Sequence, residues 1–222
     1  MKHLFLILLF FLSPIVGAIC ETLVYKQIVG DEVVIHTYII ASIDSGYSIH
    51  LTRKSESQEI YEEFNLDSLF YTQRWKYCNP SKQTDISVIR RKNVILLSGI
   101  YNGERIYKEY EIDSIPWAQL FPIGLENFVQ SAKERMKFYA ISTMSPAELK
   151  IATFTAKIRD NATISLNGGI VDAIHVRISF SGLMSVLWHG DCWFRKSDGR
   201  YIKWDAPGPP GYPHSLVELI QE

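Results

Sequence analysis

The pattern of apolar and polar residues is most regular between Ile170 and Phe180. Isoleucine and valine alternate there with histidine, arginine and serine. Successive side chains of a β-strand point to opposite faces, so this segment is predicted to be a strand with one apolar and one polar face. Similar β-rich runs predict further strands at residues 22–28, 32–43, 47–53, 86–101, 104–112, 137–143, 149–159, 163–166, 186–196 and 201–204.

Short turns separate most of these runs. Asn102-Gly103 is the strongest hairpin signal, because both positions of such a turn need positive φ. Gly30-Asp31, Asn167-Gly168-Gly169 and Ser197-Asp198-Gly199 are turn sequences of a similar kind. Loops of this length are far too short for a crossover between parallel strands. The chain is therefore predicted to be mainly β, with an antiparallel sheet.

One segment in the middle of the chain has helical spacing instead. Its apolar residues are Trp117, Leu120, Phe121, Leu125, Phe128 and Val129. Pro122 interrupts the pattern, so a short turn is predicted first and then a helix from about Leu125 to Glu134. The simplest role of this helix is to cover one face or one end of the sheet with its apolar stripe.

The first 18 residues have the pattern of a secretory signal peptide. Lys2 precedes an unbroken apolar run at residues 4–12, and Val16-Gly17-Ala18 supplies small residues where a signal peptidase cuts. The run is much shorter than the roughly 20 residues of a membrane-spanning helix. We expect a signal peptide at 1–18, one β-rich domain at 19–222 and no transmembrane segment in the mature chain.

Composition and motifs narrow the function classes. The chain contains 12 Tyr, 11 Phe and 5 Trp, and aromatic residues favour pleated, half-buried surfaces. Its formal net charge is −1, so it lacks the clustered basic face that nucleic-acid binding needs. The sequence contains no GxSxG, HExxH or Walker motif, and no GxGxxG after a strand. We therefore expect no cofactor and no enzymatic activity.

Three cysteines remain after the signal peptide. Cys78 and Cys192 are the expected disulfide, because both lie within the domain and the compartment is oxidising, although connectivity cannot be read from a sequence. Cys20 is the second residue of the mature chain, so lipidation of this cysteine is an alternative. Ile19 fits the small-residue preference before a lipidated cysteine badly. No Cys/His spacing indicates zinc.

The predicted strands at 170–180 and 186–196 form a hairpin if Ser181-Gly182-Leu183 is the loop between them. In that register His175 lies opposite His189. A polar cluster then occupies one face of the hairpin, made of His175, Arg177, His189 and Asp191. A hydrogen bond to Asp191 could fix the tautomer of a histidine ring, and two facing histidines could bind a metal ion. We favour a solvated strand face, because the pair lacks a third ligand and Arg177 would oppose a bound cation.

Other polar residues are expected to lie at the surface. Glu62-Glu63 and the pair Glu109 and Glu111 sit among charged residues and are predicted to be solvated strand faces. Asn161-Ala162-Thr163 is an N-glycosylation acceptor, which matters only in a host that glycosylates secreted proteins.

The segment 187–204 is the densest in aromatic residues. It includes Trp188 and the run Trp193-Phe194-Arg195-Lys196-Ser197-Asp198-Gly199, and Pro207-Gly208 and Pro210-Gly211 follow it. This end of the chain resembles a family of bacterial periplasmic proteins of unknown function, in which a W-x(4)-W-F/Y-R-K-S/T-D-G hairpin precedes a Gly/Pro loop. That family is similar in outline to the half-barrels of the lipoprotein carriers LolA and LolB. Cys192 departs from the pattern.

The resemblance implies a strongly curved antiparallel sheet, a half-barrel or open barrel, with one short covering helix and an apolar concave face. We expect a non-enzymatic, secreted cell-envelope protein, periplasmic in a bacterium, that binds an apolar or lipid-like ligand there. The residues expected to line this face are Ile178, Trp188, Phe194, Trp204 and Phe128. The alternatives are a structural or assembly module that docks an envelope partner protein, and a metal-dependent or other hydrolase built on His175, His189 and Asp191.

Overall fold

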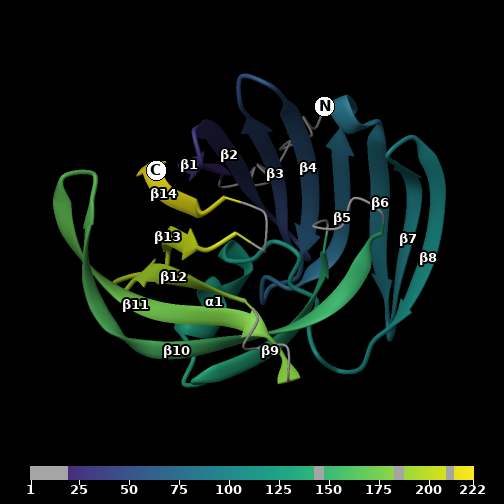
Figure 1. The fold of residues 1–222 in the computed structure, drawn as a ribbon. Helices are drawn as coiled ribbons and strands as arrows, with labels where there is room; N and C mark the ends of the chain where they lie inside the picture. Colours follow the sequence, from purple (N-terminus) through teal and green to yellow (C-terminus); the bar gives the residue numbers. More distant parts are fainter. Residues whose placement is uncertain (1–19, 143–147, 183–187, 209–212) are drawn as a thin grey trace, which may run out of the picture.

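The computed structural model describes residues 20–142, 148–182, 188–208 and 213–222, whose strands form one antiparallel sheet of 14 strands. The sheet is strongly curved and does not close (Figure 1), so the predicted fold class is confirmed. Its strands are β1 (Cys20–Val29), β2 (Glu32–Ile43), β3 (Gly46–Lys54), β4 (Glu59–Leu66), β5 (Thr72–Asn79), β6 (Thr84–Arg91), β7 (Val94–Tyr101), β8 (Glu104–Glu111), β9 (Arg135–Ser142), β10 (Lys150–Leu166), β11 (Gly169–Phe180), β12 (His189–Arg195), β13 (Tyr201–Ala206) and β14 (Ser215–Gln221).

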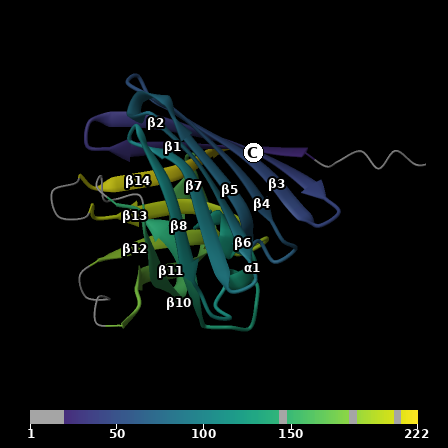
Figure 2. The same ribbon diagram turned by 90° about the vertical axis from the view of Figure 1, so that its right-hand side faces the viewer.

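The order of strands places the first and last strands of the chain side by side in the sheet. That order is β8-β7-β6-β5-β4-β3-β2-β1-β14-β13-β12-β11-β10-β9. Tyr25 of β1 lies opposite Leu219 of β14. The N-terminal strands and the C-terminal strands therefore form two walls that curve around the short helix α1 (Figures 1 and 2). β8 and β9 are the two edges.

The inner segment, residues 112–134 between the two edge strands, fills the concave side. It contains the short 3-10 helix η2 (Ile123–Leu125) and α1 (Glu126–Val129), and it buries Trp117, Leu125 and Phe128 to 5% exposure or less. The helix predicted over Leu125–Glu134 is therefore wrong in length. Ser131 ends it, because both its backbone N–H and its hydroxyl donate to the carbonyl of Phe128.

The pairing of β11 with β12 differs from the predicted hairpin. His175 lies opposite Trp193, and Ser179 lies opposite His189, so the two histidines do not face each other. The pairing is displaced by four residues along β12. Because four is an even number, each side chain stays on the face that the alternation predicted. Most of the connection between the two strands, residues 183–187, lies outside the described residues.

The strands predicted from the sequence do not include β4, β5 or β14, and the run predicted at 86–101 is divided into β6 and β7. β4 was missed although it alternates strictly. Its burial pattern places Ile60, Glu62 and Phe64 on the concave side and the residues between them outside. The charged residues Glu59, Glu62 and Glu63 hide this alternation in the sequence. The predicted solvated position of Glu62 is wrong, since it is only 6% exposed. The predicted signal peptide, 1–18, lies outside the described residues.

No helix in the described part of the chain is long and apolar enough to span a membrane.

Candidate functional site

The concave side of the sheet contains a cavity of about 260 Å³. One wall comes from β1–β5 and carries most of the polar groups. Its lining residues are Gln27, His36, Tyr38, Leu51, Arg53, Glu62, Phe64, Trp75 and Tyr77, of which Leu51 and Phe64 are apolar. The other wall comes from the inner segment and from β9, β10, β13 and β14. Its residues include Gln119, Leu120, Phe121, Pro122, Ala140, Ile141, Phe154, Tyr201, Trp204 and Val217. The cavity is thus polar on one side and mainly apolar on the other.

An ion pair lies in the polar wall. Arg53 of β3 continues the alternation of the buried Ile49 and Leu51, so it faces the concave side. Its Nη2 donates to Glu62 Oε1 on the neighbouring strand. Trp75 Nε1 donates to Glu62 Oε2 at 2.7 Å, so both carboxylate oxygens are engaged. The Glu62 side chain is 6% exposed and that of Arg53 is 31% exposed.

A histidine in the same wall is held in its neutral form. His36 Nε2 lies 2.8 Å from Gln27 Oε1, and Gln27 Nε2 donates to Ser215 Oγ at 2.8 Å. Burial, assisted by the positive charge of Arg53, lowers the pKa of His36 to about 3. Burial also raises the pKa of Tyr38 above its usual value. Both side chains are therefore uncharged near neutral pH.

Aromatic rings build the apolar wall. Phe121 of the inner segment lies 5.5 Å from Phe154 and 6.4 Å from Trp204, measured between ring centroids. Trp204 reaches this position because Gly190 has no side chain, and a Cβ there would meet the Trp204 ring at 2.4 Å. Aromatic side chains offer a large apolar contact area. This wall therefore suits a hydrocarbon group.

The predicted lining residues are only partly at the cavity. Trp204 lines it, whereas Ile178, Phe194, Phe128 and Trp188 are core residues that are 0%, 0%, 5% and 9% exposed. Trp188 supports the wall from behind, since its ring packs 6.0 Å from that of Trp204. The sequence interpretation missed Arg53, Glu62 and His36. Charged or polar residues at core-facing positions of an alternating strand are the signal that could have found them.

The polar face of β11 and β12 carries a compact ion-pair cluster. His175 Nε2 and Arg177 Nε both lie 2.8 Å from Asp191 Oδ1. His189 is more distant, with Nε2 at 4.0 Å from Asp191 Oδ2. The His175 ring stacks on Trp193 with centroids 5.1 Å apart. Among the described residues no group of three or more His, Cys, Asp or Glu is arranged to hold a metal ion.

The expected disulfide between Cys78 and Cys192 is absent, and this prediction is corrected. All three cysteines, including Cys20, are described and free. Cys192 faces the core on β12, where its thiol lies 3.3 Å from the carbonyl of Val176. Cys78 lies on β5, in the opposite wall, with β4, β3, β2, β1, β14 and β13 between the two strands. Sequence alone could not show this separation.

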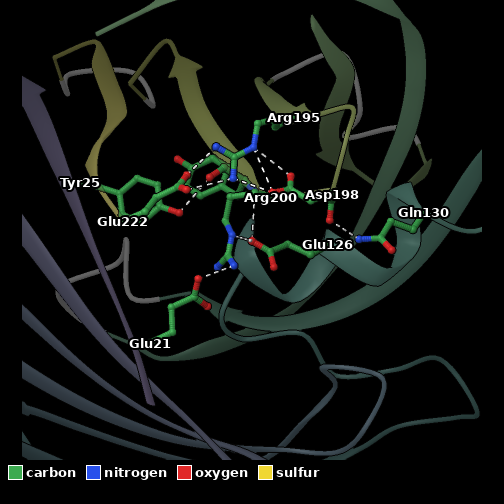
Figure 3. Close-up of polar contacts among 9 residues, drawn as sticks. Glu21, Tyr25, Glu126, Gln130, Arg195, Asp198, Arg200 and Glu222 are labelled. Carbon is green, nitrogen blue, oxygen red and sulfur yellow. Dashed lines mark hydrogen bonds and ion pairs between the residues drawn. The ribbon is translucent and has the colours of Figure 1, made fainter. Parts of the chain in front are cut away.

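A second polar cluster anchors α1 to the sheet (Figure 3). Glu126 Oε1 accepts a hydrogen bond from the backbone N–H of Tyr201 at 3.0 Å and lies 4.0 Å from Arg200 Nε. Arg200 also pairs with Glu21 of β1 at 2.7 Å. Burial raises the pKa of Glu126 to about 7, although Arg200 acts in the opposite direction.

The same cluster continues toward the C-terminal end of the described chain. Arg195 pairs with Asp198 at 2.6 Å and with Glu222 at 2.7 Å. Gln130, directly after α1, donates to the carbonyl of Asp198. These contacts join α1, the turn between β12 and β13 and the end of β14. The cluster therefore anchors the inner segment to the sheet. It is separate from the cavity, except that Tyr201 also lines the cavity.

Comparison with known proteins concerns the fold. No protein-family description matches the chain, and no curated protein matches it. A solved structure from Brucella abortus, described as a beta-barrel-like protein of domain of unknown function DUF1849, is similar with a TM-score of 0.58. The match covers 92% of this chain and 97% of that chain at 6% identity. The fold is β-barrel-like.

Proposed function

We propose that this protein is a non-enzymatic binding protein whose concave cavity takes a small amphipathic ligand. The observation that carries the proposal is the cavity with one polar and one aromatic wall. Ligand sites are mostly apolar hollows with a few placed polar groups, typically of about 300–1,000 Å³. A volume of about 260 Å³ lies just below this range and suits one short acyl chain with its head group.

The proposed place of action is the cell envelope or another secretory compartment. Residues 1–18 have the three parts of a signal peptide, and this pattern supports export of the domain that follows. Export also fits a carrier or receptor for lipid-like molecules, which are sparingly soluble in water. The resemblance of the C-terminal end to periplasmic proteins points in the same direction.

The test is native mass spectrometry of the chain purified from its own secretory compartment without detergent. A mass excess that extracts as a lipid is expected. Ala140, which lines the cavity from β9 and is 1% exposed, provides the variant. Ala140→Phe places a ring in the cavity and should remove the extra mass. A bare mass for the native chain would overturn the proposal.

Ala41→Phe is the matched control. Ala41 lies on β2 between the buried Ile40 and the exposed Ser42, and the alternation points it away from the concave side. The same change of residue is made there without filling the cavity. This variant should keep its ligand, so equal loss in both variants would contradict the cavity as the binding site.

A further inference from the structure

The cavity lining has no net charge. Arg53 and Glu62 are the only Lys, Arg, Asp or Glu residues among the described residues that line it, and they pair with each other. His36 is neutral, because burial and Arg53 lower its pKa to about 3. An ionised head group would therefore find no opposite net charge in the lining, and a charge that leaves water without a partner is costly.

The ion pair also limits how an anion could bind. A carboxylate ligand could reach the Arg53 guanidinium only in competition with Glu62, whose two oxygens are held by Arg53 and Trp75. Displacing Glu62 would leave its own charge buried without its partner, and breaking such a pair is strongly unfavourable. The site therefore disfavours anions in spite of its arginine.

The unused hydrogen-bonding capacity of the site consists mainly of donors. An arginine has five N–H donors, and among the described residues Arg53 donates from Nη2 to Glu62. Its Nε is buried and makes no hydrogen bond within the described residues. The hydroxyl of Tyr38, which also lines the cavity, is a further donor. The amide of Gln27 is already engaged on both sides.

We infer that the ligand of this cavity is an acyl compound with an uncharged head, such as an ester or amide, whose carbonyl accepts hydrogen bonds from Arg53 and Tyr38. Its hydrocarbon chain lies against Phe121, Phe154 and Trp204. The inference rests on the proposed function and names the ligand class for the same cavity.

The experiment compares three probes that share one chain, using the full chain of the protein at about pH 7.5, where a carboxylic acid is ionised. The probes are monodecanoylglycerol, decanoate and decyltrimethylammonium, and binding is measured by isothermal titration calorimetry. Monodecanoylglycerol should bind at least about tenfold more tightly than either ion, a difference of about 1.4 kcal/mol. Tighter binding of decanoate would overturn the head-group inference and leave the proposed function standing. Binding of none would overturn both.

Glu62→Gln is the decisive variant. Glutamine can still accept the hydrogen bond of Trp75 Nε1, but the positive charge of Arg53 loses its counterion. The variant should reverse the preference, so that decanoate binds more tightly than monodecanoylglycerol. An unchanged preference would overturn the inference.

A measurement on the native chain keeps the inference testable if the variant does not fold. The affinity for decanoic acid should rise at least about tenfold as pH falls from about 7 to about 4, where the acid becomes uncharged. His36, whose pKa is about 3, stays mainly neutral over this range. An affinity for decanoic acid that falls with decreasing pH would overturn the inference.

Discussion

Glu62 stabilises the polar wall through both of its carboxylate oxygens, one with Arg53 and one with Trp75. Glu62→Ala would leave a guanidinium charge and an indole N–H without their partner. We expect the free energy of unfolding to fall by about 3 kcal/mol, the lower end of the cost of breaking a buried pair. The lower end applies because the Arg53 side chain is 31% exposed and its charge can still be hydrated. Urea unfolding of the variant and the native chain measures this.

Glu63, the next residue, is the control for this experiment. It points away from the concave side and pairs with Lys76 at 2.9 Å, and both side chains are 49% exposed. Exposed ion pairs contribute about 0–1 kcal/mol, so Glu63→Ala should change the unfolding free energy little. Equal losses for the two variants would mean that the ion pair in the cavity wall has no special role.

Gly190 leaves no room for a side chain. A Cβ at this position would lie 2.4 Å from the Trp204 ring and 3.1 Å from the Cβ of Ala206. Gly190→Ala should therefore displace the ring into the cavity and cost about 1–3 kcal/mol, as overpacking does. Thermal unfolding measures the loss, with Gly169→Ala as the control, since a Cβ there meets its nearest atom at 3.6 Å. A stability loss no larger than that of the control would contradict the displacement.

At the scale of elements, the inner segment departs most from what its sequence indicates. Helical spacing of apolar residues predicted a helix of about ten residues, but α1 spans only Glu126–Val129. The spacing arose because an irregular segment enclosed by a curved sheet meets apolar surroundings on several sides. Long-range contacts place it there, and periodicity contains no information about them.

Glu126 links α1 to the sheet and makes its docking depend on pH. Its pKa is about 7 in the folded protein and about 4.3 for an unperturbed Glu. The folded chain therefore binds the proton more tightly than the unfolded chain. The stabilising effect of the proton is complete below about pH 4 and is lost as pH rises toward 7, a loss on the order of 3 kcal/mol.

Glu126→Gln should remove this part of the pH dependence and make the protein more stable than the native chain at about pH 8. Glutamine keeps an acceptor for the N–H of Tyr201 without a carboxylate that must be buried in charged form. Chemical unfolding at a series of pH values tests this, with Glu104→Gln at the exposed start of β8 as the control. Parallel pH profiles for the native chain and Glu126→Gln would contradict the role of Glu126.

At the scale of the whole molecule, turns and alternation were enough to predict an antiparallel, mainly β fold, and the resemblance added its curvature. The site could not be predicted in the same way. Arg53, Glu62 and Trp75 come from three strands, of which β4 and β5 were not predicted. Phe121 and Trp204 are far apart in the sequence but pack side by side in the apolar wall. Which strands face each other is decided by the strand order, with β1 beside β14, and no local pattern shows that order.

The curved sheet leaves two edges, and Gln119 covers part of one. Its Oε1 accepts from the backbone N–H of Ile141 at 2.7 Å, and its Nε2 donates to the Ile141 carbonyl at 3.0 Å. The side-chain amide thus takes the place of a neighbouring strand. Pro116 and Ala118 make backbone hydrogen bonds to Tyr139 on the same edge. Covered edges protect a sheet against pairing with another chain.

Gln119→Ala should therefore both destabilise and expose β9. The unpaired N–H and carbonyl of Ile141 are expected to cost about 1–3 kcal/mol, and the free edge should promote self-association, measured by sedimentation at increasing protein concentration. Gln73→Ala is the control, because Gln73 bonds the Asp67 side chain and the Tyr71 carbonyl and covers no edge. A monomeric Gln119→Ala protein with native stability would show that backbone contacts of Pro116 and Ala118 close this edge without the glutamine.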